Sequence, residues 1–453
     1  MKRLAYLALG LLVSAPVLAA PPPCMQRSSA LLQALKKHDY AGAVSHFDAR
    51  VHAVVTVKRL RQVWETALPN QFGAYDPAAV GQVAKQGPDG VVVTPLHFKH
   101  GWLHMRVACD DAGAISGFRF LPGKSPAPDD VEHAPKPASG PWGSSQPTQV
   151  ASPWGPLPAL LTLPRGKGPF PAVVLVGGSG PHDRDERIGP NRPFMDIARG
   201  LAAHGIASLR YDKRTYVYPV KSEQDTRLTI DDEVTDDAVT ALRQLAANEQ
   251  VDRRRIFVVG HSLGAMMAPR IGQRMPGLAG LVLLAAPARS LLDVLAEQTR
   301  TLGPKQGLSS AQLKSAEAGI DHERRLLEKA DPAHPPKKPF MGAPQSYWLS
   351  LDGYHQVAVA RSLHMPLLIV QGGADVQVSP TQDFARWKTA MAGRAHVRFR
   401  RFDGLSHLFM PAGKTGNAAD YMRPAHVAPG VIDAIADWIK TQPPAPKRAG
   451  RAL

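Results

Sequence analysis

An apolar, β-branched run leads into a G-x-S-x-G pentapeptide in the segment Arg255-Ile-Phe-Val-Val-Gly-His-Ser-Leu-Gly-Ala265. This pattern predicts a nucleophile elbow, a tight strand-to-helix turn that lifts the hydroxyl of Ser262 above a parallel sheet. Gly260 and Gly264 have no Cβ, so neighbouring backbone can approach and the serine can hold a strained conformation. The pentapeptide alone is a weak signal, but the strand before it and the helical segment after it support the interpretation.

Strand and helix patterns alternate on both sides of this stretch. The segment 229–248 has helical spacing, and Thr229 and Asp232 form a capping pair at its start. Buried strands separated by helices are typical of a parallel α/β sheet, which the sequence therefore predicts. The apolar runs that predict its strands begin at Ala172, Ile206, Ile256, Leu281, Leu367 and Val397.

A serine hydroxyl is a poor nucleophile, so it needs a base and an acceptor that orients the base. On an α/β sheet of this kind these residues follow the serine in the order Asp or Glu, then His. Asp375 and His407 each follow a predicted strand, at the sheet edge where ligands bind. We therefore predict the catalytic residues Ser262, Asp375 and His407. Asp403 is the alternative acid, and a role as an ordinary surface histidine is the alternative for His407.

Two backbone N–H groups are needed to stabilise the oxyanion of an acyl-transfer reaction. One is predicted to be that of Leu263, directly after the nucleophile. The second is expected from the loop Gly177-Gly-Ser-Gly-Pro181, from Ser179 or, as the alternative, from Gly178. A plain tight turn would also explain these glycines, whereas a phosphate loop would need the G-x-x-x-x-G-K-[ST] pattern, which the segment lacks.

Three segments carry a resemblance to a known family. They are Gly177-Gly-Ser-Gly-Pro-His-Asp-Arg-Asp-Glu186, Pro193-Phe-Met-Asp-Ile-Ala198 and Gly205-Ile-Ala-Ser-Leu-Arg-Tyr-Asp-Lys-Arg214. Over residues 148–440 the chain resembles bacterial α/β-hydrolase esterases, which are related to serine-aminopeptidase and prolyl-oligopeptidase-like hydrolases. The resemblance implies carboxylic-ester hydrolysis by Ser262, Asp375 and His407. The chain departs from the family at Gly177-Gly178, where His-Gly is usual. Arg210 and Asp212 match a family segment and are interpreted as a structural ion pair.

The sequence predicts an α/β-hydrolase fold with a helical cap insertion, preceded by a small α+β domain. Residues 24–121 pass from helical spacing to strand-like runs, and residues 122–147 are rich in proline and glycine, as linkers are. The hydrolase domain is expected over 148–440 and the cap over about 288–366, where Ser309-Ser-Ala-Gln312 predicts a capping box. The residues 441–453 form a basic tail.

The first residues predict export. Lys2 and Arg3 precede the apolar run 4–13, which is too short to span a bilayer, so we expect a signal peptide over 1–19, with an uncleaved anchor as the alternative. No later segment predicts a membrane span, and we expect a periplasmic or secreted protein. Cys24 and Cys109, the 2 cysteines of the chain, would form a disulfide in an oxidising compartment or else remain free thiols.

The charge balance is basic, with 54 Lys and Arg against 38 Asp and Glu. Such a balance can indicate nucleic acid, acidic lipid or an anionic substrate, but the basic residues are scattered, which favours a solvated surface and no nucleic-acid partner. His97, His100 and His104 lie along one predicted strand, where alternation would scatter them over both faces, so no metal site is predicted. No cofactor is expected, and the sequence does not predict the oligomeric state.

These patterns together predict a serine hydrolase that cleaves small carboxylic esters through an acyl-enzyme, with short or medium acyl chains. A serine peptidase on the same scaffold is the first alternative, because ester and amide cleavage share the triad. A non-catalytic binding protein of the cell envelope, working through its N-terminal domain, is the second.

Overall fold

The computed structural model describes residues 23–77, 84–86, 91–123, 135–218, 221–222, 225–331, 335–336, 339–341, 343–414, 416, 420–421 and 423–446. The predicted signal peptide, residues 1–19, lies outside these residues, as do the last residues of the basic tail. The chain forms two compact units, residues 1–128 and 129–453.

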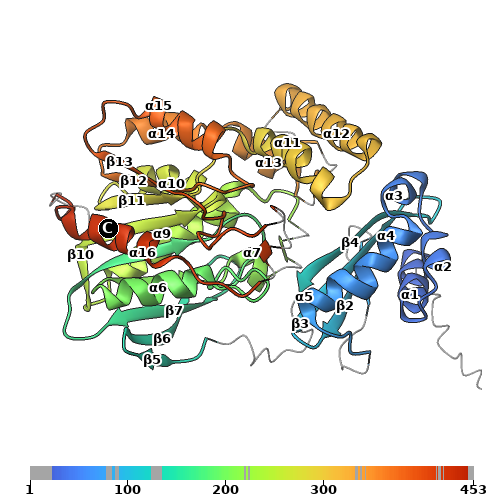
Figure 1. The fold of residues 1–453 in the computed structure, drawn as a ribbon, viewed down its shortest axis with the longest axis horizontal. Helices are drawn as coiled ribbons and strands as arrows, with labels where there is room; N and C mark the ends of the chain where they lie inside the picture. The colour runs from blue at the N-terminus through green and yellow to red at the C-terminus, as the bar shows by residue number, and fades with distance from the viewer. Residues whose placement is uncertain are drawn as a thin grey trace, which may run out of the picture. The chain divides into compact units, whose positions relative to one another are not determined.

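The first unit is a four-stranded antiparallel sheet with helices packed against it, as predicted for an α+β domain (Figure 1). Its strands follow the order β1-β2-β3-β4. Leu31 and Leu35 of the first helix lie fully buried in its core with Leu96 and Met105 of the sheet. The elements are α1 Pro23–Lys36, α2 Tyr40–Val44, α3 Ala49–Val54, α4 Val57–Gln62, η1 Val63–Ala67, α5 Leu68–Phe72, β1 Lys85–Gln86, β2 Val92–Phe98, β3 Gly101–Cys109 and β4 Ile115–Gly123.

A disulfide joins α1 to β3 in this unit. It links Cys24 to Cys109 across 85 residues of sequence, so the predicted pairing is confirmed. In the chain-entropy model, closing a loop of this length stabilises the folded state by about 4 kcal/mol.

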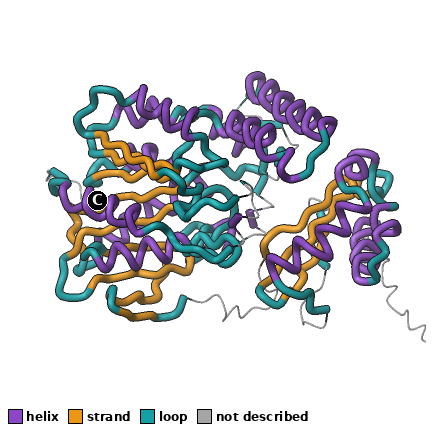
Figure 2. The backbone as a smooth tube through the Cα atoms, viewed as in Figure 1, coloured by secondary structure: helices purple, strands orange, loops and turns teal. Residues whose placement is uncertain are grey.

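The second unit contains a nine-stranded sheet of order β13-β12-β11-β10-β8-β9-β7-β6-β5. Figure 2 shows strands of this sheet in orange with helices packed around them in purple. The six strands from β13 to β9 in this order are parallel to one another, which confirms the predicted parallel sheet. The remaining three strands continue the sheet in antiparallel fashion. The strands are β5 Ala138–Gly140, β6 Gly143–Val150, β7 Leu157–Pro164, β8 Phe170–Val176, β9 Ala207–Tyr211, β10 Val251–His261, β11 Gly280–Leu284, β12 Leu367–Gly372 and β13 Val397–Phe402.

Helices cover both faces of this sheet because its central strands are apolar on both faces. On β8, Val174 packs on the side of α9 and α10, while Val173 packs on the side of α6 and α16, two helices in mutual contact (Figure 1). The helices are α6 Pro193–Ala203, α7 Arg214–Val217, η2 Asp231–Thr235, α9 Asp236–Ala246, α10 Leu263–Arg274, α11 Leu291–Leu302, η3 Pro304–Gln306, α12 Ser310–Lys329, α13 Gln345–Asp352, α14 Gln356–Ser362, η4 Pro380–Phe384, α15 Ala385–Ala390 and α16 Pro429–Thr441.

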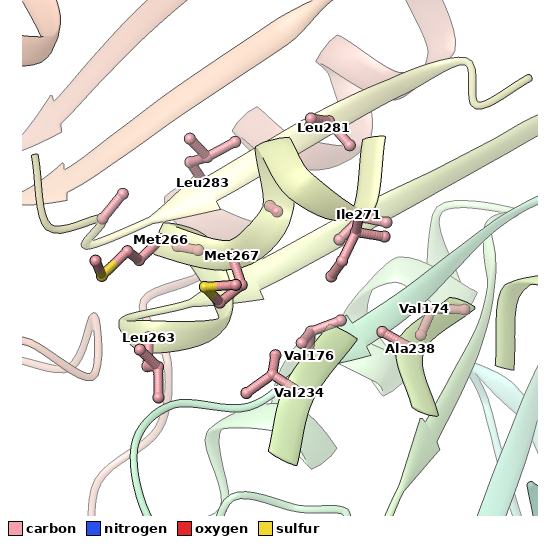
Figure 3. Close-up of a cluster of buried hydrophobic side chains, with 14 of the residues drawn as sticks. Val174, Val176, Val234, Ala238, Leu263, Met266, Met267, Ile271, Leu281 and Leu283 are labelled. Atoms are coloured by element: carbon pink, nitrogen blue, oxygen red, sulfur yellow. The ribbon is translucent and has the colours of Figure 1, made fainter. Parts of the chain in front are cut away.

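The core around α10 anchors the start of that helix. Figure 3 shows Leu263, Met266 and Met267 of α10 among Val176 of β8 and Val234, which precedes α9. These side chains are almost fully buried. Packing of this kind holds the turn before α10, where Ser262 lies, against the sheet.

The prediction of a linker over 122–147 is wrong in its second half. The strands β5 and β6 lie within or across it and pair with the main sheet, so the hydrolase unit begins before residue 148. Six of the eight residues of β6 are exposed or only partly buried, and it carries Pro147 near an end of the sheet. An antiparallel strand with one solvated face needs few apolar residues, and proline is tolerated near sheet edges, so the composition resembled a linker.

The insertion between β11 and β12 is helical, as predicted for the cap over 288–366. Ser309 and Gln312 form the expected capping box at the start of α12, which contacts both α11 and α13. Farther along, α14 packs against α10, and Ala360 of α14 lies in the main core. The last part of the insertion therefore belongs to a helical layer of the sheet.

Candidate active site

The turn between β10 and α10 has the strained geometry of a nucleophile elbow. Ser262 has φ 53° and ψ −116°, a conformation that residues with a side chain rarely adopt. A Cβ on Gly264 would lie 2.1 Å from the carbonyl oxygen of Val176, and one on Gly260 would lie 2.4 Å from that of Gly264. Both glycines are therefore required by close approach of backbone, as the sequence predicts.

Asp375 and His407 meet at the carboxyl ends of β12 and β13. The Nδ1 of His407 donates to Asp375 Oδ2 at 2.8 Å, and both side chains are buried. With its hydrogen on Nδ1, His407 presents Nε2 as a base. The alternative acid, Asp403, is 85% exposed and pairs with Arg401, so the geometry favours Asp375.

Other groups complete the environment of the Asp375 carboxylate. Its Oδ1 accepts the backbone N–H groups of Gln377 at 2.8 Å and Val378 at 3.0 Å, and its Oδ2 accepts the amide of Gln371 at 2.9 Å. Four donors, including His407, thus hold an acceptor that is removed from solvent. A carboxylate held in this way keeps one position and can therefore fix the orientation of the imidazole.

Two glycines, Gly372 and Gly373, allow the loops that follow β12 and β13 to approach each other. A Cβ on Gly372 would lie 2.4 Å from the carbonyl oxygen of Ser406, so only glycine allows the two backbones this close. The N–H of Gly373 donates to Phe402 O at 2.7 Å, which ties the end of β12 to the end of β13. This contact places Asp375 within reach of His407.

Ser262 lies on the same side of the sheet, next to His261, whose ring centroid is 4.6 Å from that of His407. Among the residues that the structure describes, none forms a hydrogen bond with the Ser262 hydroxyl. Catalytic hydrogen bonds are often loose without substrate. The proton-sharing contact between Ser262 and His407 therefore stays a prediction.

The loop after β8 lies beside the nucleophile. A Cβ on Gly178 would come within 3.2 Å of the Cβ of Ser262. The N–H of Gly178 already donates to Glu186 Oε1 at 2.6 Å, which removes it as an oxyanion donor in this geometry. No described residue accepts the N–H of Ser179, and Leu263, as the first residue of α10, has no intrahelical acceptor for its own. These two groups remain the predicted donors.

A second acid–histidine pair, Glu186 and His261, lies next to the nucleophile elbow. His261 donates from Nδ1 to Glu186 and from Nε2 to the carbonyl of His407, each at 2.9 Å. Because both partners are acceptors, His261 fits as an imidazolium. Burial lowers the pKa of His261, but Glu186 outweighs burial and raises it above its ordinary value. Burial raises the pKa of Glu186, but His261 outweighs this and the net pKa is lowered.

The interpretation of Arg210 and Asp212 as an ion pair with each other is wrong. Arg210 donates to Asp185 at 2.8 Å, whereas Asp212 pairs with Arg184 at 3.2 Å. Neighbouring residues on a strand point to opposite faces, and residues two apart share one face only while the strand continues. Here β9 ends at Tyr211, so Asp212 turns toward a different loop residue.

Two further features of the described residues concern the histidine of β2 and the length of the helices. His97 contacts Asp76 at 3.2 Å, and no group of three or more His, Cys, Asp or Glu side chains within the described ranges could hold a metal ion. Within those ranges, likewise, no helix has the length and apolar character to cross a bilayer.

The supporting roles of Glu186, His261 and Lys213 were not predicted from the sequence. His261 is a variable residue of the G-x-S-x-G motif. Lys213 lies two residues after the buried strand β9, near the sheet edge where functional residues are often found. Glu186 carried no such signal, because its role depends on contacts with residues 75 positions away in the sequence.

The fold and this site define an α/β-hydrolase with a nucleophile elbow. The chain is 33% identical over 423 residues to Esterase EstD of Thermotoga maritima, which covers 91% of this chain and 95% of that protein. Residues 191–411 match the family described as Serine aminopeptidase, S33. The chain therefore belongs to the α/β-hydrolase family that includes Esterase EstD.

Solved structures give a more distant likeness. Est1E from Butyrivibrio proteoclasticus is 16% identical with a TM-score of 0.42, covering 65% of this chain and 97% of that one. A puromycin-hydrolyzing peptidase of Mycobacterium tuberculosis is 16% identical with a TM-score of 0.43, covering 78% of this chain and 46% of that one. Scores of this size support no argument about substrate.

Proposed function

We propose that the protein is a serine esterase that cleaves carboxylic esters with short or medium acyl chains through an acyl-enzyme. The observation that carries the proposal is the buried Asp375–His407 pair on the sheet edge that also holds the strained turn at Ser262. The name of the relative from Thermotoga maritima supports ester substrates.

In the proposed reaction, His407 Nε2 removes the proton of Ser262 as Oγ attacks the ester carbonyl. The N–H groups of Leu263 and Ser179 stabilise the oxyanion of the tetrahedral intermediate. Its collapse breaks the ester C–O bond, and His407 returns the proton to the leaving alcohol. A water molecule, deprotonated by His407, then attacks the acyl carbonyl. The bond between Ser262 Oγ and the acyl carbon breaks, the acid leaves, and His407 returns the proton to Oγ. Asp375 stabilises the imidazolium throughout, and no step uses a metal or cofactor.

A fluorophosphonate probe and a substrate comparison test this proposal. The probe should label the wild type and leave Ser262→Ala unlabelled, because it reacts only with an activated serine. Labelling of both proteins would overturn the serine assignment. Absence of labelling and of ester turnover in the wild type would favour a non-catalytic binding protein.

A peptidase activity is the second candidate, favoured by the family description that matches residues 191–411. The rates of hydrolysis of a nitrophenyl ester and an aminoacyl anilide, measured on the same preparation, separate the two. An esterase should have the higher kcat/KM on the ester by a margin larger than the intrinsic reactivity difference. A higher kcat/KM on the anilide would establish the peptidase.

We also propose export to the periplasm or the medium. Lys2, Arg3 and the apolar run 4–13 support it, as does the disulfide, since disulfides persist in oxidising compartments. Fractionation of expressing cells, with the mature N-terminus read by mass spectrometry, should find the protein outside the cytoplasm and starting near Ala20. Full-length protein in the cytoplasm would contradict export.

A further inference from the structure

We infer that Lys213 is a positioning residue for the oxyanion hole: its ammonium group holds the Gly178–Ser179 peptide so that the Ser179 N–H faces the reacting carbonyl. The inference rests on the proposed esterase function and deepens it.

Lys213 lies two residues after the end of β9, and its side chain is only 5% exposed. Its Nζ donates to the carbonyl oxygen of Gly178 at 2.8 Å and to Oε1 of Glu233. A buried ammonium group is retained only when it is paired and hydrogen-bonded, so these contacts account for its burial. One of the two acceptors is the backbone of the oxyanion loop.

The contact determines where the Ser179 N–H points. In a trans peptide the C=O and N–H groups point in opposite directions, and the Gly178–Ser179 peptide is trans. With the Gly178 oxygen held by Lys213, the Ser179 N–H faces away from Lys213. Gly178 also lies against Ser262, and its own N–H is held by Glu186. Gly178 is therefore fixed at both its nitrogen and its oxygen.

Charge strengthens this arrangement. A cation on a peptide oxygen polarises the whole amide, which makes its N–H a better donor to a developing oxyanion. Glu233 balances the charge of Lys213 and lies close to Tyr347, whose pKa burial raises well above its ordinary value. Tyr347 lies on α13, so the insertion between β11 and β12 contacts the support of the oxyanion hole.

The test is Lys213→Met, measured on a nitrophenyl ester and with a boronic acid that forms a tetrahedral adduct on the serine. Loss of one oxyanion donor costs about 100- to 1,000-fold in kcat, and a misaligned donor should cost about 10- to 100-fold. KM should change less than about twofold, because the contact acts in the transition state. The affinity for the boronic acid should fall by the same factor as kcat. A purely structural role would not couple these two quantities.

Two matched double variants distinguish a folding defect from the loss of the positioning contact. Lys213→Met/Glu233→Gln and Arg214→Met/Asp237→Asn each replace a buried ion pair by neutral groups, and such replacements are often tolerated. Only the first should lose kcat and boronic acid affinity, because Arg214 donates its hydrogen bonds to Asp237 and not to the oxyanion loop. Unchanged kcat and affinity in a folded Lys213 variant, with an active wild type, would overturn this inference alone. An inactive, unlabelled wild type would overturn the proposed function as well.

Discussion

Asp375 illustrates how a single residue can order a site. Its carboxylate accepts four hydrogen bonds, and three come from the segment of the chain around it, Gln371, Gln377 and Val378. The fourth comes from His407, so three of the four hydrogen bonds that hold the acid do not depend on the base. A rigid acceptor of this kind selects the imidazole tautomer with Nε2 free.

Asp375→Asn should therefore lower kcat by about 10,000-fold, because an amide can donate to Nδ1 and favour the tautomer that cannot take the serine proton. Steady-state hydrolysis of a nitrophenyl ester at neutral pH measures the effect. Asp403→Asn is the matched control, since Asp403 is exposed and should leave kcat unchanged. A larger loss in the control than in Asp375→Asn would reverse the assignment of the acid.

The pair of Glu186 and His261 predicts a pH dependence of stability. His261 has its pKa raised above 6.5, so its contribution is complete below pH 6.5 and is lost as the pH rises through its folded pKa. Glu186 has its pKa lowered below 4.5, so its contribution is complete above pH 4.5 and is lost as the pH falls through its folded pKa. Both contributions are complete between these values.

The free energy of unfolding lost in Glu186→Gln should thus be largest between pH 4.5 and 6.5 and shrink on either side. Denaturant unfolding across the pH range measures it. Asp433→Asn, which breaks the exposed pair with His204, should change stability by less than about 1 kcal/mol. A loss in Glu186→Gln that grows toward alkaline pH would contradict the pairing.

The nucleophile elbow requires the backbone of α10 to lie in direct contact with the backbone of β8. Gly264→Ala would force a Cβ to within 2.1 Å of Val176 O, so the two elements must separate. We expect a loss of about 1–3 kcal/mol in stability and a large loss of activity. Gly319→Ala is the control, because its Cβ would meet nothing within 4 Å on α12. It should stabilise the helix by up to about 1 kcal/mol. Equal melting temperatures for the two variants would contradict this account of the elbow.

The central parallel strands could be predicted from sequence because they are buried on both faces and therefore largely apolar. The edge strand β13 differs, since Arg398, Arg400 and Arg401 are exposed on it. The strands β5 and β6 could not be predicted, since one face of an antiparallel strand may be polar and Pro147 resembles a linker residue. Asp375 and His407 could be predicted because each lies just after the end of a parallel strand. The Glu186, His261 and Lys213 contacts could not be predicted, because they depend on how four loops meet in space.

At the scale of the whole molecule, the chain divides into two units with separate cores. Both cysteines lie in the first unit, so Cys24→Ser/Cys109→Ser should destabilise that unit by about 4 kcal/mol. Calorimetry should show one transition moving to lower temperature. Labelling of Ser262, in the second unit, should be unaffected. A shift in neither transition would contradict a stabilising disulfide.

Mass spectrometry of the fluorophosphonate adduct, on the wild type and on His407→Ala, tests whether Ser262 and His407 act together. We expect one adduct, on Ser262, and a rate of labelling that falls at least about 1,000-fold without the histidine. An adduct on another serine, or labelling of Ser262 at the same rate without His407, would contradict this expectation.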